Sequence, residues 1–348
     1  MIFKSKTNKN KLLWPDIIRI ISVFLVIVIH ASATEVLSWK QVKTPDWIIG
    51  NIYDSLARIS VPLFIMLSGS LLIHKKDNLK TFFKKRVKRI FLPWMFWGTI
   101  LLFINNFAQL SNLLTGKVLN FNDFKILLME NFLSGFWFMP MIVGIYLTTP
   151  IIKKFAVNAT KKELKYFLSI WFVLASLLPT AHNLFNLNIS FIIPNWFAYL
   201  GYFVGGYCIV HRSKISENHL WQSKLIFITS LIFTIFGTYF LSAKNNQFVG
   251  YLYEYLSVNV LLMSFSSFIL LFNYFEKIKL NNKTTSYIHL ISKYSFGILL
   301  SHIVLIKYLN LPPYPLLTIP LSTLIIFFIS FSLISILKKV SFLKYIVG

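Results

Sequence analysis

The chain has 348 residues, of which 56% are apolar, 35 are Lys or Arg and only 11 are Asp or Glu, giving a formal net charge of +24. Charged residues make up 13% of the chain, about half the usual share, so a soluble globule would lack polar groups for its surface. The high apolar content excludes a disordered chain, and the single cysteine, Cys208, excludes a disulfide scaffold. A nucleic-acid partner would require a water-exposed basic face. With this composition we instead expect a polytopic membrane protein with no nucleic-acid partner, whose lysines gather on one side of the bilayer.

Apolar runs long enough to cross a hydrocarbon core of about 30 Å recur along the whole chain. We predict ten spans, at 14–33, 48–73, 90–108, 133–152, 166–182, 191–210, 222–242, 255–275, 290–309 and 315–337. Pro179 and Pro194 interrupt the fifth and the sixth. The prediction is an all-α, polytopic transmembrane bundle of about ten helices. It forms one integral-membrane domain over 1–348, with tails at 1–13 and 338–348 and no attached soluble domain.

The basic residues alternate in phase with these spans. Six segments on one side hold 26 of the 35 Lys and Arg residues, namely 1–13, 74–89, 153–165, 211–224, 276–289 and 338–348. The five segments on the other side hold only Lys40, Lys43, Lys117, Lys125 and Lys244. Because positive loops remain in the cytoplasm, both termini are expected to be cytoplasmic. The inner basic loops could also hold anionic lipid or an anionic cosubstrate.

The first span carries Asp16, Arg19 and His30. Arg19 and His30 are eleven residues apart, which places them on one helix face, about 16 Å apart along the axis. Asp16 is three residues from Arg19 and can pair with it. Ionisable groups within a span indicate function. The alternative is that Arg19 extends to lipid phosphates and that His30 is a packing residue.

The second span carries Asp54 and Arg58, which share a helix face, followed by Pro62, Ser68 and Gly69. The proline frees a backbone carbonyl, and Ser68-Gly69 permits close backbone approach or a break in the helix. Ordinary packing by small residues explains Ser68 and Gly69 equally well. The charged pair indicates a functional group or a contact that holds helices together.

The third span begins with a basic run in which Arg86 and Arg89 share a face and can clamp a phosphate. A positive anchor at the inner membrane surface explains the same run. Glu130 precedes the fourth span and is typical of a solvated loop, whereas Trp137 is typical of an aromatic belt. His302 in the ninth span is either functional or a satisfied structural histidine.

Other chemistries have little support in the sequence. No histidine pair or Cys/His set has metal-ligand spacing, so we predict no metal site. The chain has no phosphate-binding loop, no dinucleotide glycine fingerprint and no nucleophile elbow. Cys208 lies in an aromatic, glycine-rich span without a neighbouring base and is a poor nucleophile.

The ordered set of these residues resembles the bacterial membrane-bound acyltransferase family 3, over about residues 14–337. The resemblance rests on Arg19 and His30, on Ser60-Val61-Pro62-Leu63-Phe64 through Ser68-Gly69, on Arg86-x-x-Arg89 followed by Pro93, on Trp137-Phe138, and on Ser295-Phe296-Gly297 with His302. The chain looks most like the short members without a fused hydrolase domain, such as the O-acetyltransferase of enterobacterial common antigen.

The resemblance implies transfer of an acyl group, usually acetyl, from cytoplasmic acyl-CoA to sugar hydroxyls of surface polysaccharides or lipid-linked glycans. It implies that His30 is essential and that Arg19, Arg86 and Arg89 face CoA. Acyl-CoA would be a cosubstrate, with no permanently bound cofactor. The family pattern has a tyrosine three residues before the histidine of the ninth helix. Leu299 stands at that position here, which weakens the case for His302.

Acyl transfer from a thioester to a hydroxyl requires a base or nucleophile, charge stabilisation at the carbonyl and a site for the donor. His30 is the candidate for general base or acyl carrier. Asp54 or Glu130 could orient its second nitrogen, and Arg58 could stabilise the oxyanion or only neutralise Asp54. We group Ser68 with the donor-binding arginines.

Two other classes of function remain open. A membrane transporter or flippase for a glycan or small anion would share the bundle, the buried charges and the proline breaks. Transporters often have paired halves with matching broken helices, and the sequence shows no such symmetry. A non-catalytic sensor or assembly subunit is the third possibility. The acceptor, the acyl group and the oligomeric state have no signature in the sequence.

Overall fold

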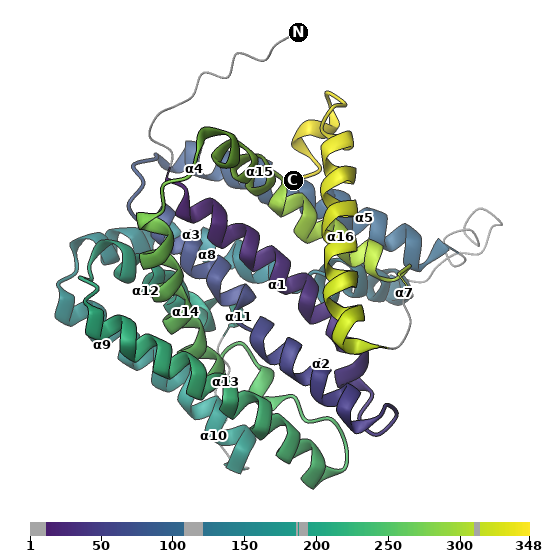
Figure 1. Ribbon diagram of the computed structural model, residues 1–348. Coiled ribbons are helices and arrows are strands. Elements are labelled where there is room, and N and C mark those ends of the chain that lie inside the picture. The colour runs from purple at the N-terminus through teal and green to yellow at the C-terminus, as the bar shows by residue number, and fades with distance from the viewer. Residues whose placement is uncertain (1–11, 108–120, 186, 188–193, 310–313) are drawn as a thin grey trace.

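A computed structural model describes residues 12–107, 121–185, 187, 194–309 and 314–348. These residues form helices and no strand, which confirms the all-α prediction (Figure 1). The basic residues of the predicted N-terminal tail, from Lys4 to Lys11, lie outside the described part of the chain.

The α-helices follow one another along the chain with short connections. Their bounds are α1 Trp14–Leu37, α2 Thr44–Ala57, α3 Ser60–Leu72, α4 Leu79–Arg86, α5 Leu92–Asn105, α7 Phe121–Leu128, α8 Phe138–Asn158, α9 Lys161–Phe172, α10 Leu178–Phe185, α11 Asn195–Ala198, α12 Leu200–His211, α13 Glu217–Asn245, α14 Val258–Lys277, α15 Asn282–Ile306 and α16 Pro315–Leu337. Three π-helical turns interrupt or extend these α-helices, namely η1 Val87–Phe91, η2 Met129–Ser134 and η3 Val173–Leu177. Two 3₁₀ turns complete the described elements, namely η4 Tyr251–Tyr253 and η5 Leu343–Tyr345.

Nine helical stretches of the described residues are long and apolar enough to cross a membrane, so the chain is a multi-pass membrane protein. They correspond to nine of the ten predicted spans. The exception is 191–210, where residues 191–193 lie outside the described part. The remainder forms α11 and the 12-residue α12, which extends only about 18 Å along its axis. Nine full-length spans among the described residues and this shorter helical segment agree with the predicted polytopic bundle of about ten helices.

Prolines set the two breaks nearest the predicted site residues. Helix α2 ends at Ala57 and α3 begins at Ser60, because Pro62 cannot donate a hydrogen bond to the carbonyl of Arg58. The π turn η1 joins α4 to α5 immediately before Pro93. Such turns are frequent at functional sites. Arg58 and Arg89 thus lie where the helical hydrogen-bond pattern changes.

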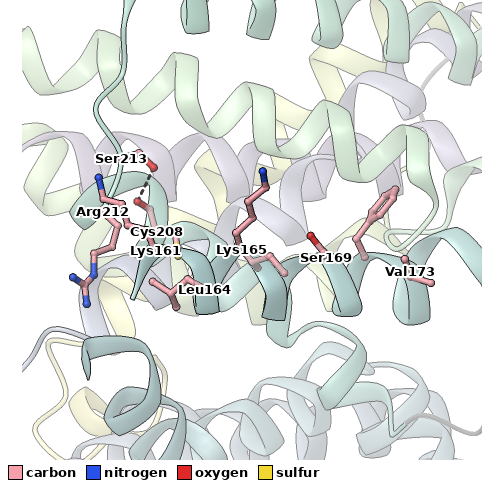
Figure 2. Close-up of a pocket in the computed structure, with 10 residues that line it drawn as sticks. Lys161, Leu164, Lys165, Ser169, Val173, Cys208, Arg212 and Ser213 are labelled. Atoms are coloured by element: carbon pink, nitrogen blue, oxygen red, sulfur yellow. Dashed lines mark hydrogen bonds between the residues drawn. The ribbon is translucent and has the colours of Figure 1, made fainter. Parts of the chain in front are cut away.

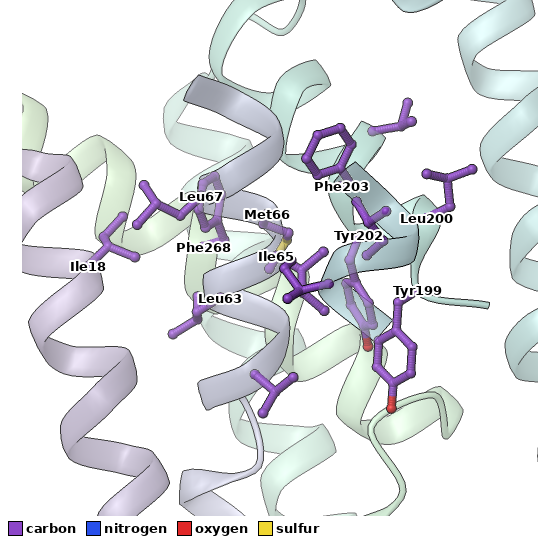
Figure 3. Packing of buried hydrophobic residues seen from close by; sticks show 14 of the residues in the cluster. Ile18, Leu63, Ile65, Met66, Leu67, Tyr199, Leu200, Tyr202, Phe203 and Phe268 are labelled. Carbon is purple, nitrogen blue, oxygen red and sulfur yellow. The ribbon is translucent and has the colours of Figure 1, made fainter. Parts of the chain in front are cut away.

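The centre of the bundle is the crossing of α3 and α12, with α1 and α14 beside it (Figure 3). A Cβ atom at Gly69 would lie 1.7 Å from the carbonyl oxygen of Phe203, and one at Gly206 would lie 2.0 Å from that of Met66. Only glycine permits this backbone approach, which confirms the role predicted for Gly69. Both faces of α12 are buried, so this helix has almost no contact with lipid.

Candidate functional site

A large cavity opens at the end of the bundle that carries most of the basic residues. It has a volume of about 1080 Å³ and is lined by α1, α3, α8 and α15, by the α4–η1 segment and by the chain after α16. Asp16 near the start of α1 and Gly348 at the C-terminus both line it, so these two segments lie at the same end of the molecule. We refer to this space as the basic cavity.

The wall of the basic cavity is strongly cationic. Its cationic side chains are Arg19, Lys75, Lys85, Arg86, Lys88, Arg89, Lys293, Lys338 and Lys344. Asp16 is the single acidic side chain among the described lining residues, and His289 also lies there. Such a surface attracts a polyanion of small-molecule size.

Arg19 is held in the wall by a network that joins α1 to α15. Its Nη1 lies 2.8 Å from Asp16 Oδ1 and donates to Ser292 Oγ at 2.6 Å. Ser292 in turn donates to Asp16 at 2.6 Å, and Asp16 also bonds His289. The predicted pairing of Asp16 with Arg19 is confirmed. Because the carboxylate is shared among three partners, Arg19 is positioned rather than fully neutralised.

The two arginines of the third span both line the cavity, as their spacing predicts. Arg86 lies over the rings of Phe82 and Tyr146, with its Cζ 5.4 Å and 5.3 Å from their centroids. The buried Nε of Arg86 has no hydrogen-bond partner among the described residues. An unsatisfied buried donor is costly, so a bound acceptor such as phosphate would stabilise it.

Lys338 is unusual among the lysines of the wall. Burial, and then the neighbouring charge of Lys293, lower the pKa of Lys338 to about 8. Its ammonium lies over the ring of Tyr294, with Nζ 4.6 Å from the centroid. At the cavity rim, the hydrogen bond from Lys85 holds the pKa of Asp77 below its ordinary value.

The cavity becomes apolar as it extends into the bundle. Phe64, Phe138 and Leu299 line this inner part, and Ser68 lies beside them. Leu299 is seventeen residues into α15, about 26 Å along the helix axis. Leu299 is also one helical turn before His302, so the inner part of the cavity leads towards that histidine.

His302 packs against His30, and the two ring centroids are 5.1 Å apart. His302 is 1% exposed, and neither of its ring nitrogens has a hydrogen-bond partner among the described residues. His30 is exposed, so one side of this histidine pair remains accessible. Sequence analysis provided only weak support for a functional role of His302, and the structure places its ring in contact with that of His30.

Asp54 and Arg58 form a buried ion pair near the histidine pair. Oδ1 of Asp54 lies 2.5 Å from Nη2 of Arg58, and the Asp54 side chain is 2% exposed. The Arg58 guanidinium lies 4.4 Å from the ring centroid of Tyr253 and 5.8 Å from that of Tyr255. Arg58 is also close enough to interact electrostatically with His30. Asp54 is therefore directed towards Arg58, with no hydrogen bond to His30.

Glu130 is the predicted site residue that lies apart from the others. It is exposed on the π turn η2, and no described contact joins it to His30. Trp137, expected in an aromatic belt, stacks on Tyr255, with ring centroids 5.4 Å apart. Trp137 therefore joins the surroundings of Arg58 and remains exposed, so its place in an aromatic belt stays a prediction.

Sequence reasoning missed most of the basic cavity. It assigned the lysines after α3, in α4, η1 and after α16 to topology, and it did not single out Lys293, His289, Ser292 or Tyr294. The only sequence signal for the lysines is their charge, and the lysines of a positive-inside loop carry the same signal. Ser292 and Tyr294 have no distinguishing signal in the sequence. Tyr253 and Tyr255 beside Arg58 were missed as well, since tyrosines near a span end are common.

The arrangement combines three chemical capacities. The cationic wall can hold a phosphate-bearing molecule, and the inner apolar part can take an extended arm. The histidine pair, one turn of α15 beyond the cavity-lining Leu299, offers imidazole nitrogens for proton transfer or nucleophilic attack. The described residues contain no group of three metal-ligating side chains.

Comparison with known proteins gives one result that covers nearly the whole chain. Residues 12–339 match the family model of the acyltransferase domain that defines acyltransferase family 3. No curated protein and no solved structure matches the chain. The similarity to the O-acetyltransferase of enterobacterial common antigen therefore stays a prediction.

Proposed function

This chain belongs to acyltransferase family 3, and from that premise we propose that it moves an acyl group, in particular acetyl, from cytoplasmic acyl-CoA to a hydroxyl of a surface polysaccharide or lipid-linked glycan. Family membership makes it a membrane acyltransferase with an acyl donor and an acceptor. The donor, the acetyl group and the glycan acceptor are our proposal.

The basic cavity is the observation that supports acyl-CoA as the donor. Acyl-CoA carries phosphates at one end and a thioester at the end of a long flexible arm. The cavity has cations at its mouth and apolar side chains towards the histidine pair, in the same order. Arg19, Arg86, Arg89 and Lys338 would hold the phosphates, and the arm would pass Ser68 and Leu299.

His30 would then act on the acceptor. As general base it takes the proton of the sugar hydroxyl while the oxygen attacks the thioester carbon. The C–O ester bond forms, the C–S bond breaks, and the proton passes from His30 to the leaving thiolate of CoA. An acyl-imidazole on His30 is the alternative route, with the same products. Arg58, whose Nε and Nη2 contact Asp54 Oδ1, would stabilise the oxyanion.

Topology supports entry of the two substrates from opposite sides. The basic cavity lies at the lysine-rich end, which the positive-inside rule assigns to the cytoplasm of a bacterial cell, where acyl-CoA is made. His30 lies about 16 Å further along α1 than Arg19, on the side away from that end. A glycan would approach His30 from the outer face.

Purified protein in vesicles with radiolabelled acetyl-CoA tests the proposal. We expect release of CoA, and transfer of label to added glycan acceptor, without any ion gradient. A His30→Ala variant that retains acetyl-CoA binding should release none. Gradient-dependent movement of label across the membrane without CoA release would instead identify a transporter. Loss of one O-acyl signal from surface glycan in cells lacking the gene would identify the acceptor.

A further inference from the structure

A second groove lies on the outside of the bundle, between α9 and the end of α12 (Figure 2). It has a volume of about 460 Å³, within the range of small-ligand sites. None of its lining residues lines the basic cavity, so the two spaces are separate. Helix α9 lies at the edge of the molecule in Figure 1, where the groove would face lipid.

One end of this groove is cationic. Lys161 and Lys165 are one turn apart on α9, and Arg212 lies beside Lys161 after α12 (Figure 2). No carboxylate is among the described residues that line the groove. The three cationic side chains therefore share this groove without a carboxylate side chain among its described lining residues, and such a surface attracts an anion.

Arg212 is fixed in place at this cationic end. Its Nη2 donates to the carbonyl oxygens of Ala156 at 3.2 Å, Val157 at 2.5 Å and Ala159 at 3.3 Å. The backbone at the end of α8 thus orients the guanidinium. Its buried Nε has no partner among the described residues. A donor held in this way, and unsatisfied, favours an oxyanion as its partner.

The groove becomes apolar along α9, away from these charges. Leu164, Leu168 and Phe172 follow one another at helical spacing, with Val173 at the far end. From Lys161 to Val173 the helix advances about 18 Å, which exceeds half of the hydrocarbon thickness. From the membrane surface inwards, the groove is first cationic and then apolar. A phospholipid has the matching order, with its phosphate at the membrane surface and its acyl chain further in.

We propose that this groove is a binding site for an anionic phospholipid of the cytoplasmic leaflet. Its phosphate lies against Lys161, Lys165 and Arg212, and one acyl chain lies along Leu164, Leu168 and Phe172. The Lys and Arg cluster accounts for the preference for an anionic headgroup. The apolar stripe accounts for a lipid rather than a soluble phosphate ester. The site does not depend on acyl transfer.

Binding is measured by native mass spectrometry of the purified protein titrated with phosphatidylglycerol, and in parallel with phosphatidylcholine. We expect phosphatidylglycerol to bind at least about five-fold more tightly than phosphatidylcholine. Lys161→Gln with Lys165→Gln should remove that preference. The matched control is Lys162→Gln with Lys224→Gln, which removes the same charge from exposed positions outside the groove. That control should retain the preference.

Two further arms distinguish a lipid site from its alternatives. Ser169→Trp fills the exposed groove without changing charge, and we expect it to weaken phosphatidylglycerol binding. Glycerol phosphate at the same concentration should not displace the lipid. If the control variant lost the preference for phosphatidylglycerol as fully as the Lys161/Lys165 variant, the preference would reflect general attraction of anionic lipid to a positive surface, which would overturn the proposal. Displacement by glycerol phosphate, or no effect of Ser169→Trp, would likewise overturn the proposal. A wild-type thermal unfolding midpoint in detergent for every variant checks that the fold is intact.

Discussion

His30 on α1 and His302 on α15 lie side by side, with their ring centroids 5.1 Å apart, although 272 positions separate them in the chain. One ring is exposed and the other is 1% exposed. His302 lies one turn of α15 beyond Leu299, which lines the basic cavity, and His30 lies on the accessible side of the pair. Under the proposed function, this is where the donor and the acceptor would meet.

The first prediction concerns His30 itself. His30→Ala should lower acyl transfer by at least about 100-fold, since a positioned general base contributes that much or more. Acetyl-CoA affinity should stay within two-fold or so, because the phosphates bind elsewhere. CoA release and acetyl-CoA binding are measured on the same preparation. His182→Ala, at an exposed histidine on α10, is the control. Near-normal transfer by His30→Ala would refute the assigned role.

The second prediction concerns the arginines of the cavity wall. Arg86→Ala and Arg89→Ala should each raise the acetyl-CoA requirement by roughly ten-fold, because each removes a charge-assisted contact to phosphate. The maximal rate should change less. Lys84→Ala is the matched control, as this exposed lysine on α4 does not line the cavity. An unchanged requirement in the arginine variants would leave these residues as topology signals only.

The third prediction follows from the pKa of Lys338, which burial lowers to about 8. Only the protonated ammonium attracts phosphate, and a bound polyanion would raise this pKa. The affinity for acetyl-CoA should therefore be highest below pH 8 and should fall as the pH rises from 8 to 9. Lys338→Met should flatten that fall, whereas Lys339→Met, at the exposed neighbour, should preserve it. Calorimetric titrations at pH 7, 8 and 9 measure how acetyl-CoA affinity depends on pH in each protein. The same dependence in the wild type and both variants would contradict the role of Lys338.

The fourth prediction concerns the Asp54–Arg58 ion pair. Asp54→Asn leaves Arg58 without its partner inside the bundle, which should reduce the free energy of unfolding by about 3 kcal/mol. Adding Arg58→Gln should recover part of that loss. Thermal unfolding in detergent measures both. Asp77→Asn, in the Lys85 pair at the surface, should have little effect. Equal stability of the single and double variants would show that the two charges are not coupled.

The fifth prediction concerns the α3–α12 crossing. Gly69→Ala and Gly206→Ala place a methyl group against backbone carbonyls, so each should destabilise the fold by more than 3 kcal/mol or so. Gly250→Ala is the control, because its methyl group would meet only the Phe248 ring, at 3.2 Å. Unfolding midpoints of the three variants are compared. A wild-type midpoint for Gly69→Ala would mean that the helices separate without cost.

Periodicity and composition predicted the helical bundle and nine of its spans, because transfer into lipid is decided locally, about twenty residues at a time. At 191–210 the described residues form α11 and α12, which are helical but shorter than a full span. Helix α12 is apolar because protein surrounds it, and an apolar run in the protein interior has the composition of one in lipid.

The candidate site was only partly predictable. Arg19, Arg86 and Arg89 were found because helical spacing reports which side chains share a face, and all three line one cavity. The pairing of His30 with His302, and the lysines of the wall, depend on how distant helices pack, which no local spacing encodes. Glu130 lies at the exposed surface, which agrees with the solvated loop residue that the sequence indicated, and its proposed orientation of His30 stays a prediction.

The shortness of α12 has a consequence for how the protein is made. A 12-residue helix of about 18 Å is too short to be recognised by the insertion machinery as an independent span. Its glycine face must find α3, which is synthesised more than a hundred residues earlier and is already in the membrane. Biogenesis should therefore include a step in which α12 enters against a preassembled partner. A variant changed at Gly69 should then lower the yield of inserted protein as well as the stability of the finished bundle.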